Sequence, residues 1–374
     1  MLNDICLFNP IRENDRRLLA SRGPLYKSEL EFVALSSAVP DIVRKSRENL
    51  KKGWQTEVAL DLNVIIRMEQ CILHGKSLES QGLMNFVKLI NDSEVVLMPG
   101  FAIGEVKAEF APNLRAAFEA FTQKYFPAMI DMETATYTPE QDKRNRRHFA
   151  SADPNKRKSF AMYYVSILLL YIVSDQDDLS GEQKFKRYLE RLMYYTGIIG
   201  YVETIIAQFV FYDRIKSDNQ IWSEFCKEIK ENFLKSRGNV EKILLNSYNQ
   251  SHDLYLLRAS SITHGEDREW GKSDFWIASA DKGLVNLSTI LYFELGSDGR
   301  HTGMLALEPI FAESQIEDYW VKTSNFRSEF LRHRDQQFKR GELADVGIET
   351  ILKHAAALEA QIKGNFSEPP GAIY

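Results

Sequence analysis

The feature that most constrains the fold of this chain is a pair of short apolar runs, each of which ends in an aspartate. Residues 58–60 lead into Asp61, and residues 275–280 lead into Asp281. Runs of this length and composition predict buried strands. A third strand is predicted over residues 95–98, after a segment with helical spacing of its apolar residues. Strands that alternate with helices predict an α/β fold built on a parallel sheet.

Four carboxylates occupy distinctive positions relative to these strands. Asp61 and Asp281 each follow a predicted strand directly, and Glu105 comes shortly after the strand at residues 95–98. Asp253 opens an apolar segment that we predict to be the start of a helix. In open α/β sheets, ligands bind outside the carboxyl ends of the strands. Because carboxylates in one pocket repel one another unless a cation lies between them, the sequence predicts a divalent metal site.

The order and contexts of these acids resemble those of the PIN-domain nucleases. In that family an Asp lies in a D-x-N motif after the first strand, and a Glu follows the next strand. A further Asp begins a later helix, and a final Asp lies in an [ST]-x-D motif at a strand end. The matching residues here are Asp61 with Asn63, Glu105, Asp253, and Ser279 with Asp281. The resemblance covers residues 54–110 and 246–295, and the long interval between Glu105 and Asp253 predicts an inserted subdomain.

The resemblance implies a metal-dependent nuclease that acts on RNA, with DNA as the alternative substrate. Its catalytic and metal-binding residues would be Asp61, Glu105, Asp253 and Asp281, with Mg²⁺ or Mn²⁺ as the cofactor. Asn63, Ser279 and Lys282 would orient these ligands or the phosphate. A bound metal ion activates water and stabilises charge on the phosphodiester, so hydrolysis would need no protein nucleophile. The second hypothesis is a catalytically inactive PIN-like protein that binds a partner through its helical insertion or through residues 324–363.

Each acid also has an ordinary structural explanation. Asp61 and Asp253 could cap the helices that we predict after them. Asp281 could belong to the turn by which the chain leaves a strand. Glu105 competes with Glu109, which would lie on the same face one helical turn further on. The shorter distance from the strand end favours Glu105.

A local cluster of positive charge is the main sign of nucleic-acid binding. The net charge of −5 gives no global sign of it, so any such surface must be local. The cluster consists of Lys143, Arg144, Arg146, Arg147, Lys156, Arg157 and Lys158. Such clusters suit contacts with phosphate, which provide affinity without sequence information. The ordinary alternative is a solvated loop.

The chain has 374 residues, which is enough for two or three domains. We predict an N-terminal helical extension over residues 1–53 and a PIN-like core over residues 54–110 and 246–310. Between the two parts of the core, residues 111–245 are predicted to form a mostly helical insertion. Residues 311–374 are predicted to form a C-terminal helical tail. The expected architecture is therefore a PIN-like parallel sheet flanked by helices, with a large helical insertion.

Two apolar stretches, residues 160–173 and 192–212, require a comparison with membrane segments. The first is shorter than a bilayer span. The second contains Glu203, and Gly197 and Gly200 would weaken it as a single helix. We therefore predict two buried core helices in mutual contact, and no membrane partner. Three dispersed cysteines and an N-terminus without a secretory pattern predict a cytoplasmic protein.

Several other enzyme classes lack their sequence signatures. The chain has no H-E-x-x-H zinc motif, no G-x-x-x-x-G-K-[ST] loop and no G-x-S-x-G elbow. A phosphatase that forms an aspartyl-phosphate would require Asp-x-Asp at the position of Asp61 and Asn63. The sequence leaves open the oligomeric state and the presence of an inhibitory protein partner.

Overall fold

The computed structural model describes residues 5–8, 41–106, 110–129, 149–152, 154–213, 220–235, 239–263, 267–268, 271–295, 301–310, 318–341 and 346–364. The chain divides into two compact units. Unit 1 contains Met1–Leu19, Ser37–Arg147 and Leu256–Leu305. Unit 2 contains Ala20–Ser36, His148–Tyr255 and Ala306–Tyr374.

This division differs from the predicted organisation at residues 111–245. The part of this segment up to Arg147 groups with the sheet in unit 1, and the rest belongs to unit 2 together with residues 311–374. The reason lies in helix α7 (Ala111–Tyr125), which buries Leu114 and Phe121 in the same apolar core as the strands. Helical spacing identifies a helix, but it does not specify the core against which that helix packs.

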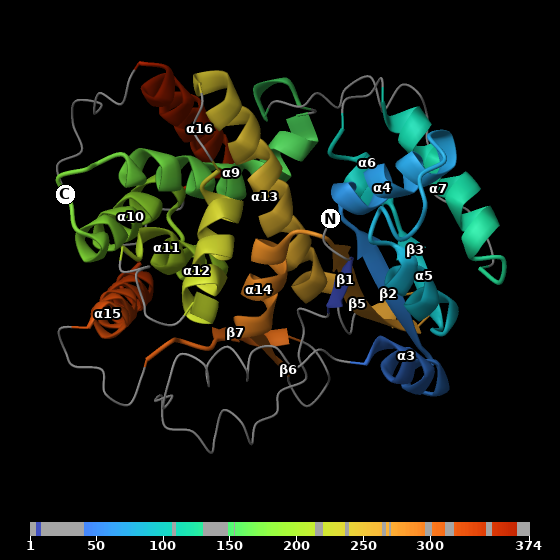
Figure 1. The fold of residues 1–374 in the computed structure, drawn as a ribbon. Helices are drawn as coiled ribbons and strands as arrows, with labels where there is room; N and C mark the ends of the chain where they lie inside the picture. The colour runs from blue at the N-terminus through green and yellow to red at the C-terminus, as the bar shows by residue number, and fades with distance from the viewer. Residues whose placement is uncertain are drawn as a thin grey trace. The chain divides into compact units, whose positions relative to one another are not determined.

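Unit 1 is built around a mixed sheet with the strand order β1-β5-β2-β3 (Figure 1). Strand β2 (Trp54–Leu60) lies between β5 (Gly271–Ser279) and β3 (Val95–Met98) and is parallel to both. Strand β1 (Cys6–Phe8) is antiparallel to β5 at the sheet edge, and β4 (Asp267–Arg268) also pairs antiparallel with β5. The predicted α/β class is confirmed. The expectation of a parallel sheet, and of a helical extension over residues 1–53, is wrong at β1, because three residues are too few to show a strand period.

Helices flank this sheet, and a small second sheet follows it in sequence. The helices of unit 1 are α3 (Ile42–Lys51), α4 (Leu62–Leu73), α5 (Met84–Asn91), α6 (Gly100–Ile103), α7 and α14 (Lys282–Ile290). Strands β6 (Leu291–Leu295) and β7 (His301–Ala306) form the two-stranded sheet. The strand at residues 95–98 and the strand-to-helix transition at Asp61 are therefore placed as predicted.

The alternation of side chains along β2 and β5 separates two faces of the sheet. Val58, Leu60 and Trp276 belong to the main apolar core of unit 1. Successive side chains of a strand point to opposite faces, so Ala59 and Phe275 lie on the other face. Asp61 and Ser279 continue this second row at the ends of β2 and β5, where the candidate site lies.

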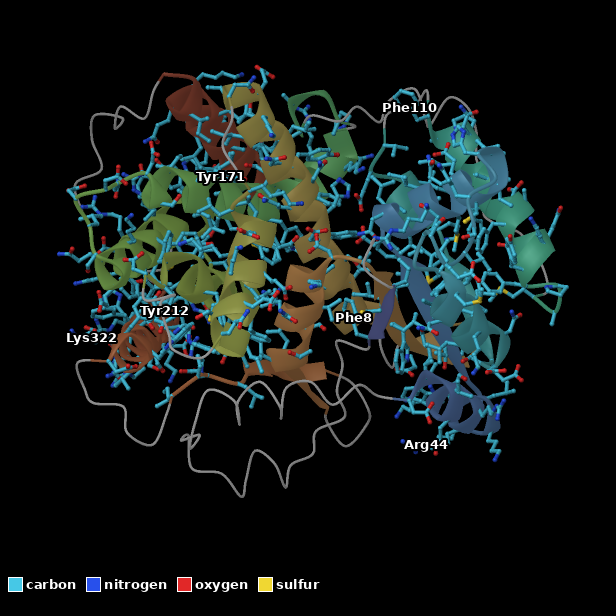
Figure 2. All side chains as sticks on the ribbon, viewed as in Figure 1. Phe8, Arg44, Phe110, Tyr171, Tyr212 and Lys322 are labelled. Atoms are coloured by element: carbon cyan, nitrogen blue, oxygen red, sulfur yellow. The ribbon has the colours of Figure 1, made fainter. Side chains whose placement is uncertain are left out.

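Buried hydrogen bonds attach α3 to the sheet. Asn49 Nδ2 donates to Asp274 Oδ2 at 2.6 Å and to Thr56 Oγ1 at 3.0 Å. Trp276 Nε1 donates to the same carboxylate oxygen of Asp274 at 2.9 Å. Arg44, on the side of α3 away from the sheet, is exposed (Figure 2). One face of α3 is therefore attached to the sheet by hydrogen bonds between buried polar side chains.

Unit 2 is helical throughout its described core. Its helices are η1 (Phe149–Ser151), α9 (Pro154–Ser174), α10 (Gly181–Thr196), α11 (Tyr201–Phe211), α12 (Gln220–Phe233), α13 (Val240–Thr263), α15 (Tyr319–Lys339) and α16 (Ile348–Lys363). Helix α13 continues beyond Tyr255, where the chain passes from unit 2 to unit 1. Nearly every residue from Phe160 to Val173 in α9 is buried, and α10, α11 and α16 pack against this helix. The predicted contact between the two apolar stretches is confirmed.

The apolar stretch at residues 192–212 is divided between two helices. Helix α10 ends at Thr196, and Gly197 adopts a left-handed conformation with φ of 68°. Helix α11 begins at Tyr201, directly after Gly200. Among the helices in the described part of the chain, none combines the length and apolar character that crossing a bilayer requires.

Candidate functional site

Asp61 and Asp281 lie at the carboxyl ends of neighbouring parallel strands. Strand β2 ends one residue before Asp61, and β5 ends two residues before Asp281. The backbone N–H of Asp61 still donates to the carbonyl of Ala278 at 3.0 Å, which continues the pairing of the two strands to their ends. The structure thus brings both aspartates to one edge of the sheet, where α/β folds bind ligands.

Ser279 connects these two aspartates. Its hydroxyl donates a hydrogen bond to Asp61 Oδ2. The same hydroxyl oxygen accepts the backbone N–H of Asp281 at 3.0 Å. Ser279 has an exposed fraction of 0%, so it orients its neighbours and is not placed to contact a substrate.

Asn63 adds a second link between the two strand ends. Its Nδ2 donates to Asp61 Oδ2 at 2.5 Å and lies 3.3 Å from Ser279 Oγ. Its Oδ1 accepts the backbone N–H of Ala280 at 3.1 Å. The side chain of Asn63 therefore joins the first turn of α4 to the end of β5 and holds the Asp61 carboxylate between them.

Helix capping explains the side chain of Asp281 but not that of Asp61. Asp61 occupies the N-cap position of α4 in an extended conformation, but its side chain makes no hydrogen bond that caps this helix. Asp281 is the N-cap of α14, and its Oδ1 accepts the backbone N–H of Gly283 at 3.2 Å. Helix capping thus accounts for Asp281 in part, whereas the Asp61 carboxylate is directed towards Ser279 and Asn63.

Glu105 lies in the turn after α6, which follows β3. Its backbone N–H donates to the carbonyl of Ala102 at 3.1 Å, and the residue is half-buried. Strand β3 is the neighbour of β2 on the side opposite β5. The competing acid, Glu109, lies outside the described residues.

Asp253 has a different setting from the one predicted. Helix α13 begins at Val240, so the expectation that a helix starts at Asp253 is wrong, and this residue caps no helix. The apolar residues Leu244 and Tyr248 already follow the helical spacing upstream of it. Asp253 is half-buried and accepts a hydrogen bond from Asn232 Nδ2 at 3.4 Å, within unit 2.

The buried imidazole next to Asp253 is that of His252. It packs against the rings of Phe160 and Tyr248, with ring centroids 4.4 and 4.8 Å away. Burial lowers the pKa of His252 well below its usual value, and the positive charge of Lys156 lowers it further. His252 is therefore neutral in the folded protein at neutral pH.

The side chains that the structure describes do not form a metal site built from three or more acidic, histidine or cysteine ligands. Across those residues, no group of three or more His, Cys, Asp or Glu side chains is arranged to hold a metal ion. Of the four acids predicted from the sequence, Asp61 and Asp281 are linked through Ser279, and Asp253 belongs to the other unit.

The predicted basic cluster is described only in its second half. Lys143, Arg144, Arg146 and Arg147 lie outside the described residues. Lys156, Arg157 and Lys158 lie at the start of α9 in unit 2. The Lys156 ammonium lies over the rings of Phe160 and Tyr248, 5.6 and 5.8 Å from their centroids. Lys158 Nζ lies 2.9 Å from Glu349 Oε1.

One residue beside the site had no signal in the sequence. The register of β1 on β5 places Cys6 directly opposite Ser279. Directly opposed residues of an antiparallel pair point to the same face of a sheet, so the exposed thiol of Cys6 lies on the face of Ser279. A strand of three residues gives no periodic pattern from which this neighbour could be recognised.

The arrangement at the ends of β2 and β5 is therefore one carboxylate, that of Asp61, held by a buried serine and a half-buried asparagine, with the helix-capping carboxylate of Asp281 at the end of the neighbouring strand. Oxygen donors held in this way suit a hard divalent cation. In comparisons with known proteins, no family model, no curated protein and no solved structure matches this chain.

Proposed function

We propose that this protein is a metal-dependent nuclease that hydrolyses phosphodiester bonds in RNA, with Asp61 and Asp281 as the carboxylates that hold Mg²⁺ or Mn²⁺. The observation that carries the proposal is the hydrogen-bond link at the ends of adjacent parallel strands, in which the Ser279 hydroxyl joins the Asp61 carboxylate to the backbone N–H of Asp281. The order of the acidic motifs, which resembles that of the PIN-domain nucleases, supplies the substrate class.

The donor set of unit 1 fits such a cation. Magnesium usually keeps several waters and is bound by one or two carboxylates together with substrate phosphates, so two aspartates are a sufficient protein contribution. Carboxylate oxygens suit manganese equally. When bound, the ion supplies a water of lowered pKa and positive charge that stabilises the phosphodiester oxygens.

Ser279 and Asn63 orient the Asp61 carboxylate in this proposal. Both donate to the same oxygen, Oδ2, and so restrict rotation of the carboxylate. Hydrogen-bond partners of this kind typically change metal affinity or activity by about 10- to 100-fold when they are removed. Ser279 is buried, so its contribution is to position Asp61.

Two further residues of unit 1 complete the proposed site. Lys282 is exposed and follows Asp281 directly, so its ammonium can contact a phosphate of the substrate. Glu105 follows β3, the other neighbour of β2, and would be the further acid that acts on the bound ion through water. Asp253 belongs to unit 2 and is assigned no role here.

The start of α9 provides the proposed phosphate-binding surface in unit 2. Lys156, Arg157 and Lys158 follow one another there. The N-terminal end of a helix favours anions, and cations add to this preference. These residues are expected to contribute affinity for RNA rather than catalysis.

The test is cleavage of single-stranded and structured RNA by the purified protein in Mg²⁺, in Mn²⁺ or in EDTA. Asp61→Asn and Asp281→Asn each remove one charge but preserve shape, and each should lower the cleavage rate by about 100-fold or more. Asp41→Asn is the matched control, because Asp41 is also an N-cap of unit 1 and asparagine caps helices equally well. Its cleavage rate should equal that of the wild type.

Two outcomes would contradict this assignment in different ways. Full activity in both Asp→Asn variants would exclude the site at the strand ends. RNA binding without cleavage in either metal ion would favour the inactive PIN-like binding protein, the second hypothesis from the sequence.

A further inference from the structure

The N-terminal ends of α9 and α16 lie together within unit 2. Lys158 Nζ is 2.9 Å from Glu349 Oε1 near the starts of the two helices. Further along both helices, Tyr164 Oη donates to Glu359 Oε1 at 2.9 Å. The two contacts occur in the same order along each helix, so α9 and α16 run in the same direction. Their positive dipole ends therefore adjoin each other.

Apolar packing holds α16 in this place. Ile351, Ala355, Leu358 and Ile362 recur at three- and four-residue spacing, and all four are buried. Helix α9, against which α16 packs, is buried along most of its length. The position of Glu349 thus follows from the packing of a whole helix and not from its ion pair alone.

The charges at this end are distributed unequally between the two helices. The first turn of α9 contains no acid, and Lys156, Arg157 and Lys158 all lie within the first five residues of the helix. Cations at a helix N-terminus oppose the helix dipole, so this region favours a bound anion. Among the described residues, Glu349, in the first turn of α16, supplies an anion there.

The ion pair remains accessible from solvent. The side chains of Lys158 and Glu349 keep exposed fractions of 48% and 68%. An RNA phosphate can therefore approach Lys158 and replace the carboxylate, since both groups accept hydrogen bonds from an ammonium.

We infer that Glu349 competes with RNA phosphate for Lys158, so that α16 lowers the RNA affinity of the surface at the start of α9. This inference rests on the proposed function, in which that surface binds RNA, and it adds an intramolecular competitor to it. Exposed ion pairs are weak, so removal of the competitor should change affinity by about two- to fivefold.

The experiment measures the dissociation constant of the full-length protein for a labelled single-stranded RNA, in EDTA and at low salt. Glu349→Gln should bind RNA about two- to fivefold more tightly than the wild type. Glu231→Gln is the matched control, because Glu231 is an exposed acid of the same unit and pairs with Lys227 within α12. It should change the dissociation constant less.

A double-mutant cycle shows whether the effect passes through Lys158. Lys158→Gln should weaken RNA binding, and Glu349→Gln should have no further effect in that background. Equal tightening by Glu349→Gln and Glu231→Gln would overturn the inference, as would tightening that persists without Lys158, and both would leave the proposed function intact. Wild-type RNA binding that Glu349→Gln leaves unchanged would overturn the inference alone. The absence of RNA binding in the wild type and every variant would overturn the proposed function and the inference together.

Discussion

At the scale of single residues, Asp61 lies at the start of a helix but its side chain does not cap that helix. An aspartate at the start of a helix usually accepts backbone N–H groups of the first turn. Asp61 instead accepts hydrogen bonds from Ser279 and Asn63, side chains that the sequence places on two different segments. A carboxylate held by neighbouring side chains at a strand end is typical of a ligand-binding residue.

Chemical modification of the Cys6 thiol tests whether the site lies at the ends of β2 and β5. Cys6 is exposed and pairs with Ser279, whereas Cys71 and Cys226 are buried, and burial raises the pKa of the Cys71 thiol. A maleimide reagent should therefore modify Cys6 first, as peptide mass spectrometry would show. A bulky group there should obstruct the adjacent strand ends and lower RNA cleavage by about tenfold or more. Cys6→Ser exposed to the same reagent should keep its activity, and undiminished cleavage by the labelled wild type would place the site elsewhere.

At the scale of elements, the helical unit depends on a close approach between α10 and the end of α11. Gly181 is the first residue of α10. A Cβ atom on this glycine would lie 2.3 Å from the carbonyl oxygen of Phe211 and 2.9 Å from Asp213 Oδ2. The first of these atoms belongs to the backbone and cannot rotate away. The short distance between α10 and the end of α11 therefore favours glycine at position 181.

Gly181→Ala should accordingly lower the free energy of unfolding by about 1–3 kcal/mol, although alanine is the better helix former. Gly100→Ala is the matched control, because Gly100 also begins a helix, α6, and has no atom within 4 Å of the added Cβ. The control should stay within about 0.5 kcal/mol of the wild type. Urea unfolding of both variants measures the difference, and equal stabilities would show that the α10 start can move away from α11.

At the scale of the whole chain, the free energy of unfolding should depend on pH through His252, which belongs to unit 2. This imidazole is buried, which lowers its pKa, and the facing charged group is Lys156. The unfolded chain binds a proton at a pKa of about 6.5, whereas the folded protein does so only at lower pH. The contribution of neutral His252 to the free energy of unfolding is thus fully present above about pH 6.5. It decreases as the pH falls from there towards the folded-state pKa.

Between pH 7.5 and 5.5, the free energy of unfolding of the wild type should fall by about 1 kcal/mol through this group. His252→Phe keeps a ring beside Phe160 and Tyr248 but removes the titrating group. Its loss of stability over the same pH interval should be smaller by that amount. Urea unfolding at the two pH values measures both, and parallel losses in the two proteins would mean that His252 does not titrate differently in the folded and unfolded states.

The sequence by itself determined the local elements that carry the site. The apolar runs before Asp61 and Asp281 are strands, each is followed by a helix, and residues 160–173 lie in a buried helix. These features follow from periodicity and end signals within a few residues of chain, which are read without knowledge of any partner.

Only the tertiary structure decided which of these elements meet. It paired Cys6 with Ser279, joined Ser279 to Asp61 across 218 residues of sequence, and placed Asp253 inside α13, in the part of this helix that belongs to unit 2. Local patterns specify which face of an element is apolar, but many partners can cover the same face. The choice among them depends on strand register and side-chain packing between distant segments, and these exist only once the chain has folded.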